Sequence, residues 1–280
     1  MAYKNFIPEV WAEAIERELE RLHVFVSNCN RKYEGEVKKM GDSVRILGVG
    51  RPTITEVKRD SFSSLTAPET VEDTSQVMYI DNMAYFNYKV DDIDKRQAVG
   101  GLMEALSAET SEGLADVQDK AVANLVTDNL AIPDAGTAYQ ITANNILEKL
   151  LDAHRLLLEQ DVPMSTKVTV TLDPYTAMLY KQALAILDTD NSALLKNGKI
   201  GTFDGMDIKV SNNCYTTVSG GTTYSKFMVR TDRAIAFARP MIHTEPYRPE
   251  LDFSDAVKGF ILYGTKIVRP KEMIVMNCYR

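Results

Sequence analysis

We predict from the sequence an α+β fold in which a compact unit is inserted into an elongated domain, and three observations indicate it. Alternating apolar and polar residues predict strands that run out along residues 33–59 and back along 77–90. A helical pattern then continues from 94 to 130, which would span about 55 Å as one helix. Residues 140–255 alternate short helices with short strands, which is typical of a compact α/β or α+β unit.

The composition is that of an ordinary globular protein. Of 280 residues, 45% are hydrophobic and 25% are charged, and 32 basic against 39 acidic residues give a net charge of −7. This balance excludes a disordered chain and disfavours a dedicated DNA-binding module, which usually carries a strongly basic surface. Cys29, Cys214 and Cys278 are odd in number and far apart, so we expect free thiols in a reducing compartment.

Neither a secretory signal nor a membrane span is predicted. The first residues include Lys4 and Asn5 without an apolar run, and charged residues then interrupt 9–21. The chain also lacks an uncharged apolar stretch of the length that a spanning helix needs. We therefore expect a soluble protein that is made in the cytoplasm.

An amphipathic helix is predicted over residues 8–25. Pro8 suits the first helical position. Trp11, Ile15 and Leu19 recur at helical spacing and form one apolar stripe. This stripe must be buried, either on the chain's own body or on a neighbouring subunit, and the sequence leaves both open.

The strands before the long helix form an extended excursion. Residues 60–76, which contain four acidic residues, are expected to form an exposed tip. On the return, Phe86 and Tyr88 alternate with Tyr85 and more polar residues. Because an isolated two-stranded ribbon is marginal in water, we expect the excursion to lie on another subunit. The outward strands are predicted at 36–40, 43–47 and 53–58.

The long helix and two later strands are expected to frame the compact unit. Asp91, Asp92 and Asp94 crowd the start of the helix, where the helix dipole favours negative charge. Strand-like runs at 260–268 and 273–278 are predicted to pair beside this helix. The compact unit would then be an insertion between two halves of one domain.

Local signals define elements within the compact unit. A helix over 144–160 precedes a strand over 167–172, and Asp173 is placed to cap a second helix that continues to 187. Farther along, we predict a turn and strand over 198–210, a loop or hairpin over 212–225, and strands over 226–230 and 234–238.

Catalytic, cofactor and metal motifs are missing from the sequence. His23, His154 and His243 lie outside any H-E-x-x-H spacing, and neither a C-x-x-C pair nor a P-loop occurs. Residues 188–192 look like the start of a calcium loop. They lack the glycine and the final acid of that loop, so we interpret them as an exposed turn. We expect no cofactor, no bound metal and no enzymatic activity.

Five runs along the chain carry a resemblance to a known family. They are FIPEVWAEAIERELERLHVF (6–25), GDSVRI (41–46), YFNYKVDDIDKRQ (85–97), GKIGTFDGMDIKVSNN (198–213) and VKGFILYGTKIVRPKEM (257–273). Together with the order of the predicted segments, they resemble the major capsid proteins of tailed bacteriophages, which have the HK97-like fold. The resemblance covers essentially the whole chain.

The resemblance implies an HK97-like capsid fold with five parts. These are an N-terminal arm (1–32), an extended β E-loop (33–90), a peripheral or P domain with a long spine helix (91–135), an inserted axial or A domain (136–255), and closing strands of the P domain (256–280). It also implies contacts between subunits through the arm and the E-loop. The contact residues expected on this basis are Trp11, Ile15, Leu19, Phe62, Leu65, Phe86 and Tyr88.

The function that the resemblance implies is that of a major capsid protein, which self-assembles into the icosahedral shell around phage double-stranded DNA. The implied partners are copies of the chain in pentamers and hexamers, a portal and decoration proteins, with or without a separate scaffolding protein. The DNA would be enclosed without sequence-specific binding and no membrane would be involved. Assembly would take place in the host bacterial cytoplasm, and the product would reside in the virion. Three other interpretations stay open: an encapsulin-like nanocompartment shell, an α/β enzyme with an unrecognised site in 136–255, and a head–tail connector or tail protein that forms rings or tubes.

Overall fold

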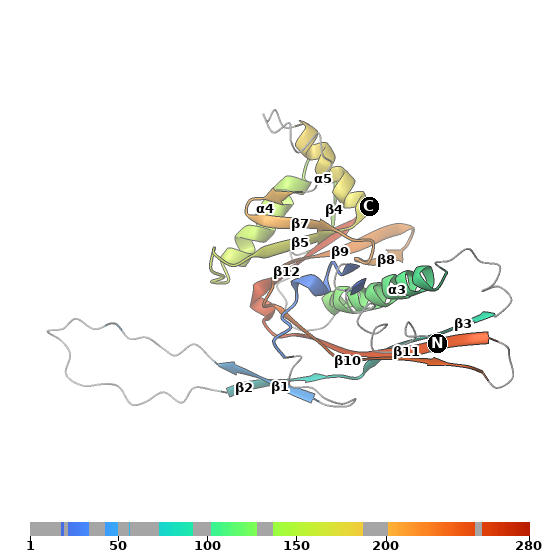
Figure 1. The fold of residues 1–280 in the computed structure, drawn as a ribbon. Coiled ribbons are helices and arrows are strands. Elements are labelled where there is room, and N and C mark those ends of the chain that lie inside the picture. Colours follow the sequence, from blue (N-terminus) through green and yellow to red (C-terminus); the bar gives the residue numbers. More distant parts are fainter. Residues whose placement is uncertain are drawn as a thin grey trace, which may run out of the picture.

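Two β-sheets with helices packed on them organise the molecule (Figure 1). The structure is a computed structural model. It describes residues 18–19, 22–33, 43–49, 56, 73–91, 102–127, 137–186, 201–249 and 254–280. The α+β class predicted from the sequence is confirmed, because helices pack against sheets whose strands are mostly antiparallel.

The larger sheet has seven strands in the order β4-β12-β9-β5-β7-β6, with β8 paired to β9. Its pairs are antiparallel except β5 with β7 and β12 with β4. Every residue of β5 is buried, as expected for a central strand that is covered on both faces. The strands are β4 (Tyr139–Gln140), β5 (Val168–Leu172), β6 (Thr202–Phe203), β7 (Met206–Val210), β8 (Tyr215–Ser219), β9 (Thr222–Thr231) and β12 (Met273–Tyr279).

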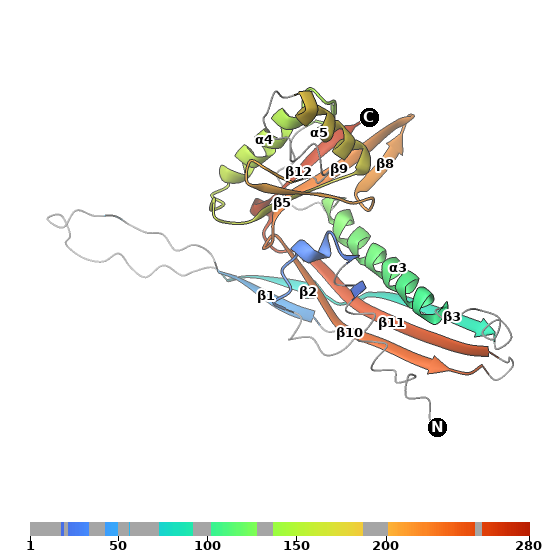
Figure 2. The ribbon, with the colours of Figure 1, turned by 45° about the horizontal axis from the view of Figure 1, so that its top comes forward.

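Two helices, α4 (Ile146–Leu158) and α5 (Pro174–Ile186), lie on the larger sheet (Figure 2). On α4, Ile146, Leu150 and Leu157 are buried and recur at helical spacing. They join the main hydrophobic core, which also contains residues of α5 and of the strands β5, β7, β9 and β12. The core therefore fills the space between these helices and the sheet, as the helical pattern of this region predicts, and it extends to Phe25, Val26 and the C-terminal end of α3.

The local signals of the compact unit are confirmed. The carboxylate of Asp173 accepts a hydrogen bond from the backbone N–H of Thr176 at 2.9 Å, so it caps α5 as predicted. Strands β8 and β9 form a hairpin through Gly220 and Gly221, which both have positive φ, as a tight two-residue turn requires. The segment 212–225, predicted as a loop or hairpin, contains this hairpin turn.

The smaller sheet has three antiparallel strands in the order β10-β11-β3. The helix α3 (Leu102–Asn124) lies along one face of it and continues as a 3-10 turn to Thr127 (Figure 2). We call this covered face the inner face and the opposite one the outer face. Leu114 and Ala115 of α3 pack there against Ile261. The strands are β10 (Ile235–Tyr247), β11 (Ser254–Ile267) and β3 (Asn82–Asp91).

The strands β1 (Ser43–Val49) and β2 (Asp73–Tyr79) form an antiparallel ribbon whose root packs on the outer face (Figure 1). Gly264 of β11 permits this close approach, because a Cβ atom there would collide with the carbonyl oxygen of Tyr79 and the side chain of Ile80. The root of the ribbon therefore lies on its own chain, whereas the sequence suggested another subunit as the surface. The buried residues of this contact are Val44, Ile46, Met78, Ile80, Ala236, Ala238 and Leu262.

Two expectations about strands differ from the structure. The return run 77–90 is two strands, β2 and β3, which pair with different partners on either side of residues 80 and 81. The prediction that both closing strands pair beside the long helix holds for β11 and is wrong for β12, which pairs with β9 in the larger sheet. The 3-10 turn at Pro270–Glu272 leads the chain from β11 into the larger sheet. The first four residues of β12 are all buried, so the sequence pattern of this strand is compatible with a covered position in either sheet.

Other expectations fall partly or wholly outside the described residues. The predicted helix over 94–130 is confirmed from 102 onward, as α3 and its 3-10 turn, and its two ends are outside the description. The predicted strand at 36–40 and, apart from Glu56, the one at 53–58 also lie outside it, as does most of the tip at 60–76. The division of the chain into arm, E-loop, P domain and A domain stays a prediction.

A buried carboxylate holds the segment 22–33, which follows the N-terminal helical residues. Asp119 of α3 is 2% exposed and accepts hydrogen bonds from the backbone N–H groups of Val24 at 2.8 Å and Val26 at 3.0 Å. The Nδ1 atom of His23 lies 3.3 Å from the same carboxylate. These contacts fix the segment to α3.

A buried guanidinium holds the same segment from the larger sheet. Arg230 of β9 is 1% exposed and donates to the carbonyl oxygens of Phe25 and Asn28, both at 2.6 Å. Just beyond, the backbone of Asn30 bonds to β10, where its N–H donates to the oxygen of Ile235 at 2.8 Å. The segment 22–33 thus connects α3, the larger sheet and the smaller sheet.

Asp119 is ionised in the folded chain. Burial alone raises the pKa of Asp119, but the contact with His23 and the two N–H groups of Val24 and Val26 outweigh it and bring the pKa below its ordinary value. Because the folded-state pKa is the lower one, Asp119 stabilises the fold above the unfolded-state pKa of about 3.9. This contribution is lost as the pH falls through the folded-state pKa.

We expect Asp119→Asn to lower the free energy of unfolding by about 2–4 kcal/mol at pH 7, since one buried N–H loses its acceptor. The difference from the wild type should shrink as the pH falls below the unfolded-state pKa of about 3.9, and it should vanish below the lower pKa of the folded state. Urea denaturation of unassembled chains, followed by circular dichroism at several pH values, measures both. Asp152→Asn serves as the control and should change little, because this side chain on α4 is 45% exposed and its ion pair with Lys149 is open to solvent. A difference that does not vary with pH would contradict the role of the charge.

Candidate assembly surface

The two faces of β3 lie in opposite environments. Ala84 and Phe86 pack toward α3 on the inner face, with Leu19 and Ile261. On the outer face, Tyr85 is 75% exposed, and Met83 is also largely open to solvent. Large aromatic and sulfur-containing side chains that stay exposed on a sheet are typical of a protein–protein contact.

The strand register extends the exposed residues of β3 into a continuous patch. Tyr85 pairs with Phe260 of β11, and Phe260 pairs with His243 of β10, so the three side chains form one row. The rings of His243 and Phe260 are in contact, with centroids 5.6 Å apart. We call Met83, Tyr85, His243, Phe260 and Tyr247 the outer patch.

A rim of polar groups borders the outer patch. The Nζ atom of Lys258 lies 3.3 Å from a carboxylate oxygen of Glu245 and 5.1 Å from the centre of the Tyr247 ring. The hydroxyl of Tyr247 donates to the amide oxygen of Asn87 at 3.0 Å. An apolar centre with a polar, hydrogen-bonded rim is the usual anatomy of a subunit interface.

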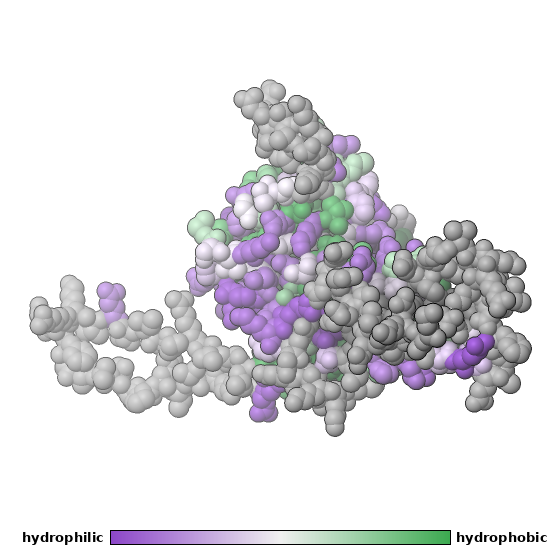
Figure 3. Space-filling model, in the orientation of Figure 1, coloured by the Kyte–Doolittle hydropathy of each residue, from purple (hydrophilic) through white to green (hydrophobic). Residues whose placement is uncertain are grey.

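Elsewhere on the described surface, exposed hydrophobic side chains are mostly single residues, apart from Tyr175 and Met178, one turn apart on α5. Met164 is 85% exposed in the turn after α4, and Val218 is 70% exposed on β8. Figure 3 shows one face of the molecule, where hydrophilic side chains predominate over α4, β5 and β7 and only small hydrophobic areas lie between them. Single exposed residues of this kind are normal on any protein. The outer patch differs because its members are adjacent.

The contact residues expected from the sequence fall into two groups. Trp11, Ile15, Phe62 and Leu65 lie outside the described residues. The other three, Leu19, Phe86 and Tyr88, contact their own chain on the inner face.

The structure shows the contacts that these three residues make within the subunit, and the expected contact with a neighbour stays a prediction. Leu19 is fully buried against Leu114 and Ala115 of α3. The ring of Phe86 lies over Gly259, and Tyr88 stacks on Phe86 with centroids 5.9 Å apart. Burial raises the pKa of the Tyr88 hydroxyl, although the neighbouring Thr110 side chain of α3 lowers it in part. In the structure, these side chains stabilise the subunit.

Sequence reasoning missed Met83 and Tyr85 because β3 carries aromatic residues on both faces. Alternation separates the two faces and does not say which one is covered. The deciding feature is Gly259, which is opposite Phe86 in the register and leaves room for its ring. A glycine far away in sequence becomes informative only once the strand pairing is known.

Reactive side chains are kept apart or buried in the described part of the chain. Within it, no group of three or more His, Cys, Asp and Glu residues could hold a metal ion. His154 lies 2.6 Å from the carboxylate of Asp204 on the surface. Burial raises the pKa of Cys214 to about 12 and also raises that of Cys29, which makes both thiols poor nucleophiles. None of the described helices is long and apolar enough to cross a membrane.

Comparison with solved structures relates this architecture to viral shells. The chain matches a structure of Mycobacterium phage Che8 with a TM-score of 0.75 and 28% identity, over 91% of this chain and 90% of that one. It matches a capsid structure of the cyanophage P-SCSP1u with a TM-score of 0.69 and 14% identity, over 92% and 86%. A virus-like particle from Pyrococcus furiosus matches with a TM-score of 0.61 and 13% identity, over 96% and 98%.

These matches define the class of the fold. The chain has the HK97-like fold of tailed-bacteriophage capsid proteins, and the resemblance inferred from the sequence is confirmed. Comparison of the sequence alone with known families and with curated proteins gives no match. The relationship is thus carried by the architecture and by the identity to the Che8 structure.

We expect Phe86→Ala to lower the free energy of unfolding by about 2–4 kcal/mol, because it leaves a void over Gly259. Tyr85→Ala on the opposite face should change it by less than about 0.5 kcal/mol, because the side chain is exposed. Urea denaturation of unassembled chains measures both. Equal losses for the two variants would contradict the assignment of the two faces.

Proposed function

We propose that this chain is a major capsid protein that self-assembles into the icosahedral head shell of a tailed bacteriophage, around double-stranded DNA. The observation that carries the proposal is the match to Mycobacterium phage Che8, at 28% identity over nine-tenths of both chains. Matches named as capsids of the cyanophage P-SCSP1u and of bacteriophage PhiM1 support it. We place the chain in pentamers and hexamers, with a portal and decoration proteins as further partners.

The surfaces of the subunit suit repeated association. In a closed shell each copy offers the same surfaces to several neighbours, so one exposed patch is used many times. The outer patch provides aromatic residues of the kind that dominate interface energies, including the exposed Tyr85 on the edge strand β3. Contacts that are weak singly and numerous together allow errors to be corrected and still give a stable container.

The net charge of −7 fits a container for DNA. An acidic wall does not hold the phosphate backbone, so the enclosed DNA can be packed and released without being trapped on the shell. This argument concerns the whole chain and requires no base-specific contacts.

A second candidate is a nanocompartment that encloses protein cargo. The virus-like particle from Pyrococcus furiosus favours it, since the match covers 96% of this chain and 98% of that one. Its identity is 13%, against 28% for the Che8 structure, and the phage capsid is therefore our first proposal. The contents of purified particles distinguish the two, because a phage shell takes up DNA and a nanocompartment retains a protein.

Electron microscopy of the purified chain tests the assembly itself. We expect closed icosahedral particles, alone or after co-expression with the neighbouring structural genes. Rings or tubes would instead indicate a connector or tail protein. A monomer at high protein concentration under both conditions would contradict the proposal.

We expect Tyr85→Ser to raise the protein concentration needed for assembly by about tenfold or more, because an interface aromatic typically contributes at least about 2 kcal/mol. Met164→Ser is the matched control, since Met164 is exposed and lies away from the outer patch. Light scattering at increasing concentrations measures both variants. An unchanged threshold for Tyr85→Ser would remove the outer patch from the interface.

A further inference from the structure

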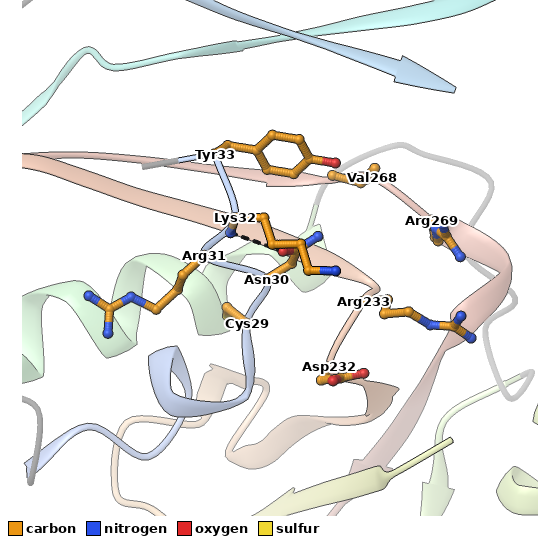
Figure 4. A pocket seen from close by; sticks show the side chains of 9 residues that line it. All are labelled: Cys29, Asn30, Arg31, Lys32, Tyr33, Asp232, Arg233, Val268 and Arg269. Atoms are coloured by element: carbon orange, nitrogen blue, oxygen red, sulfur yellow. Dashed lines mark hydrogen bonds between the residues drawn. The ribbon is translucent and has the colours of Figure 1, made fainter. Parts of the chain in front are cut away.

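Two neighbouring segments carry the chain between the sheets. Residues 232–234 lead from β9 in the larger sheet to β10 in the smaller one, and residues 268–272 lead back from β11 to β12. Because β9 pairs with β12 and β10 pairs with β11, the two crossovers lie next to each other. We call the two crossovers the junction. Figure 4 shows Arg233 and Arg269, one from each crossover, at the same end of the pocket that they line.

Strand pairing is interrupted at the junction. Between residues 231–234 and 268–272, all of which the structure describes, the register contains no strand pair. The oxygen of Ala234 accepts hydrogen bonds from the N–H groups of Val268, at 2.9 Å, and of Arg269, at 3.1 Å. Side-chain contacts therefore have to hold the rest of the junction together.

The carboxylate of Glu272 makes these contacts to both crossovers. One of its oxygens lies 2.8 Å from Nη1 of Arg269, on its own crossover. The other accepts a hydrogen bond from the hydroxyl of Thr231 at 2.6 Å and lies 3.3 Å from Nε of Arg233, on the opposite crossover. The side chain of Glu272 is 12% exposed, so water and salt screen its ion pairs less than they screen a surface pair.

Arg233 extends the contact to the body of the larger sheet. Its Nη2 atom donates to the hydroxyl of Thr166 at 3.3 Å, and Thr166 lies in the turn before β5. The side chain that Glu272 holds on the first crossover is thus also attached to the turn that leads into a central strand.

Glu272 is charged in the folded chain. Burial raises its pKa, but the hydroxyl of Thr231 and the guanidinium groups of Arg233 and Arg269, which face the carboxylate from both crossovers, outweigh burial and lower the pKa. Because the folded-state pKa is the lower one, these contacts are present above the unfolded-state value of about 4.3. They are lost as the pH falls through the folded-state pKa.

We propose that Glu272 is a charge-dependent clamp that fixes the angle between the larger and the smaller sheet. The charged carboxylate holds Arg233 and Arg269 together, so the two crossovers act as one rigid connection. Without that charge the two guanidinium groups repel each other, and crossovers of a few residues are the kind of segment at which hinge rotation takes place.

The clamp controls how the surfaces of one subunit are oriented. The outer patch lies on the smaller sheet, whereas α4 and α5 lie on the larger one. The segment 22–33 is also held to both sheets, through Asp119 and Arg230. Loss of the clamp should therefore widen the range of angles without separating the sheets. The inference concerns the single chain and does not rest on the proposed function.

Hydrogen exchange of unassembled chains tests the clamp at the junction itself. Glu272→Gln keeps the shape of the side chain and removes its charge. We expect the N–H groups of Val268 and Arg269 to exchange at least tenfold faster in this variant, while β5 keeps its wild-type protection. Glu159→Gln is the matched control, since Glu159 also pairs with an arginine, Arg155, on the exposed surface of α4. Unchanged exchange at the junction, or equal acceleration in β5, would overturn the proposal.

Distances between two spin labels measure the angle. Nitroxide labels are attached at Lys181→Cys on α5 and at Met83→Cys on β3, which are exposed positions on the two sheets. A chain without added cysteines reports any labelling of the native thiols. We expect electron–electron resonance at pH 7 to give a distance distribution at least twice as wide for Glu272→Gln as for the wild type. An equal width, or the same widening in Glu159→Gln, would contradict a clamp at the junction.

Arg269→Gln provides a second variant that does not depend on the folding of Glu272→Gln. The side chain of Arg269 is 52% exposed, so its replacement should leave the fold intact, which circular dichroism checks. Because it removes one arm of the clamp, we expect the distance distribution to widen in the same direction by a smaller amount. A folded Arg269→Gln chain with the wild-type width would also overturn the proposal.

Discussion

Two buried charges, Asp119 of α3 and Arg230 of β9, hold the same short segment of chain from opposite sides. Their partners are mainly backbone groups of residues 24–28, so the contacts fix the path of the main chain. Removing either charge would leave donors or acceptors without partners in a region closed to water. The relative placement of the two sheets depends on this arrangement, because the same segment continues into the backbone bonds with β10.

The surfaces proposed for assembly follow from this placement. Residues 29–33 leave the fixed segment and line a surface pocket together with residues 232–233 and 268–269, while Tyr33 also packs against the root of the ribbon. The smaller sheet presents α3 on one side and leaves Met83 and Tyr85 open on the other. The interior of the subunit thus determines which groups are available to a neighbour.

Prediction from the sequence succeeded where a single residue decides the local structure. The cap at Asp173 and the turn at Gly220 and Gly221 are of this kind. Prediction failed where the structure depends on residues that are distant in the sequence. The pattern of β12 is compatible with either sheet, and the strand pairs with β9. The covered face of β3 is decided by Gly259, which leaves space for the Phe86 ring. The roles of Asp119 and Arg230 carry no sequence signal, because backbone groups, which every residue has, are their partners.

The contact between Gly264 and the backbone of Tyr79 has a mechanical consequence. The root of the ribbon contacts β11 at Gly264, where the strand has no side chain. This close backbone contact fixes the direction in which the ribbon leaves the sheet. A small rotation of the ribbon at this glycine displaces its residues by an amount that grows with their distance from the contact along β1 and β2. In a shell of the proposed kind, the same change of direction would recur in every copy.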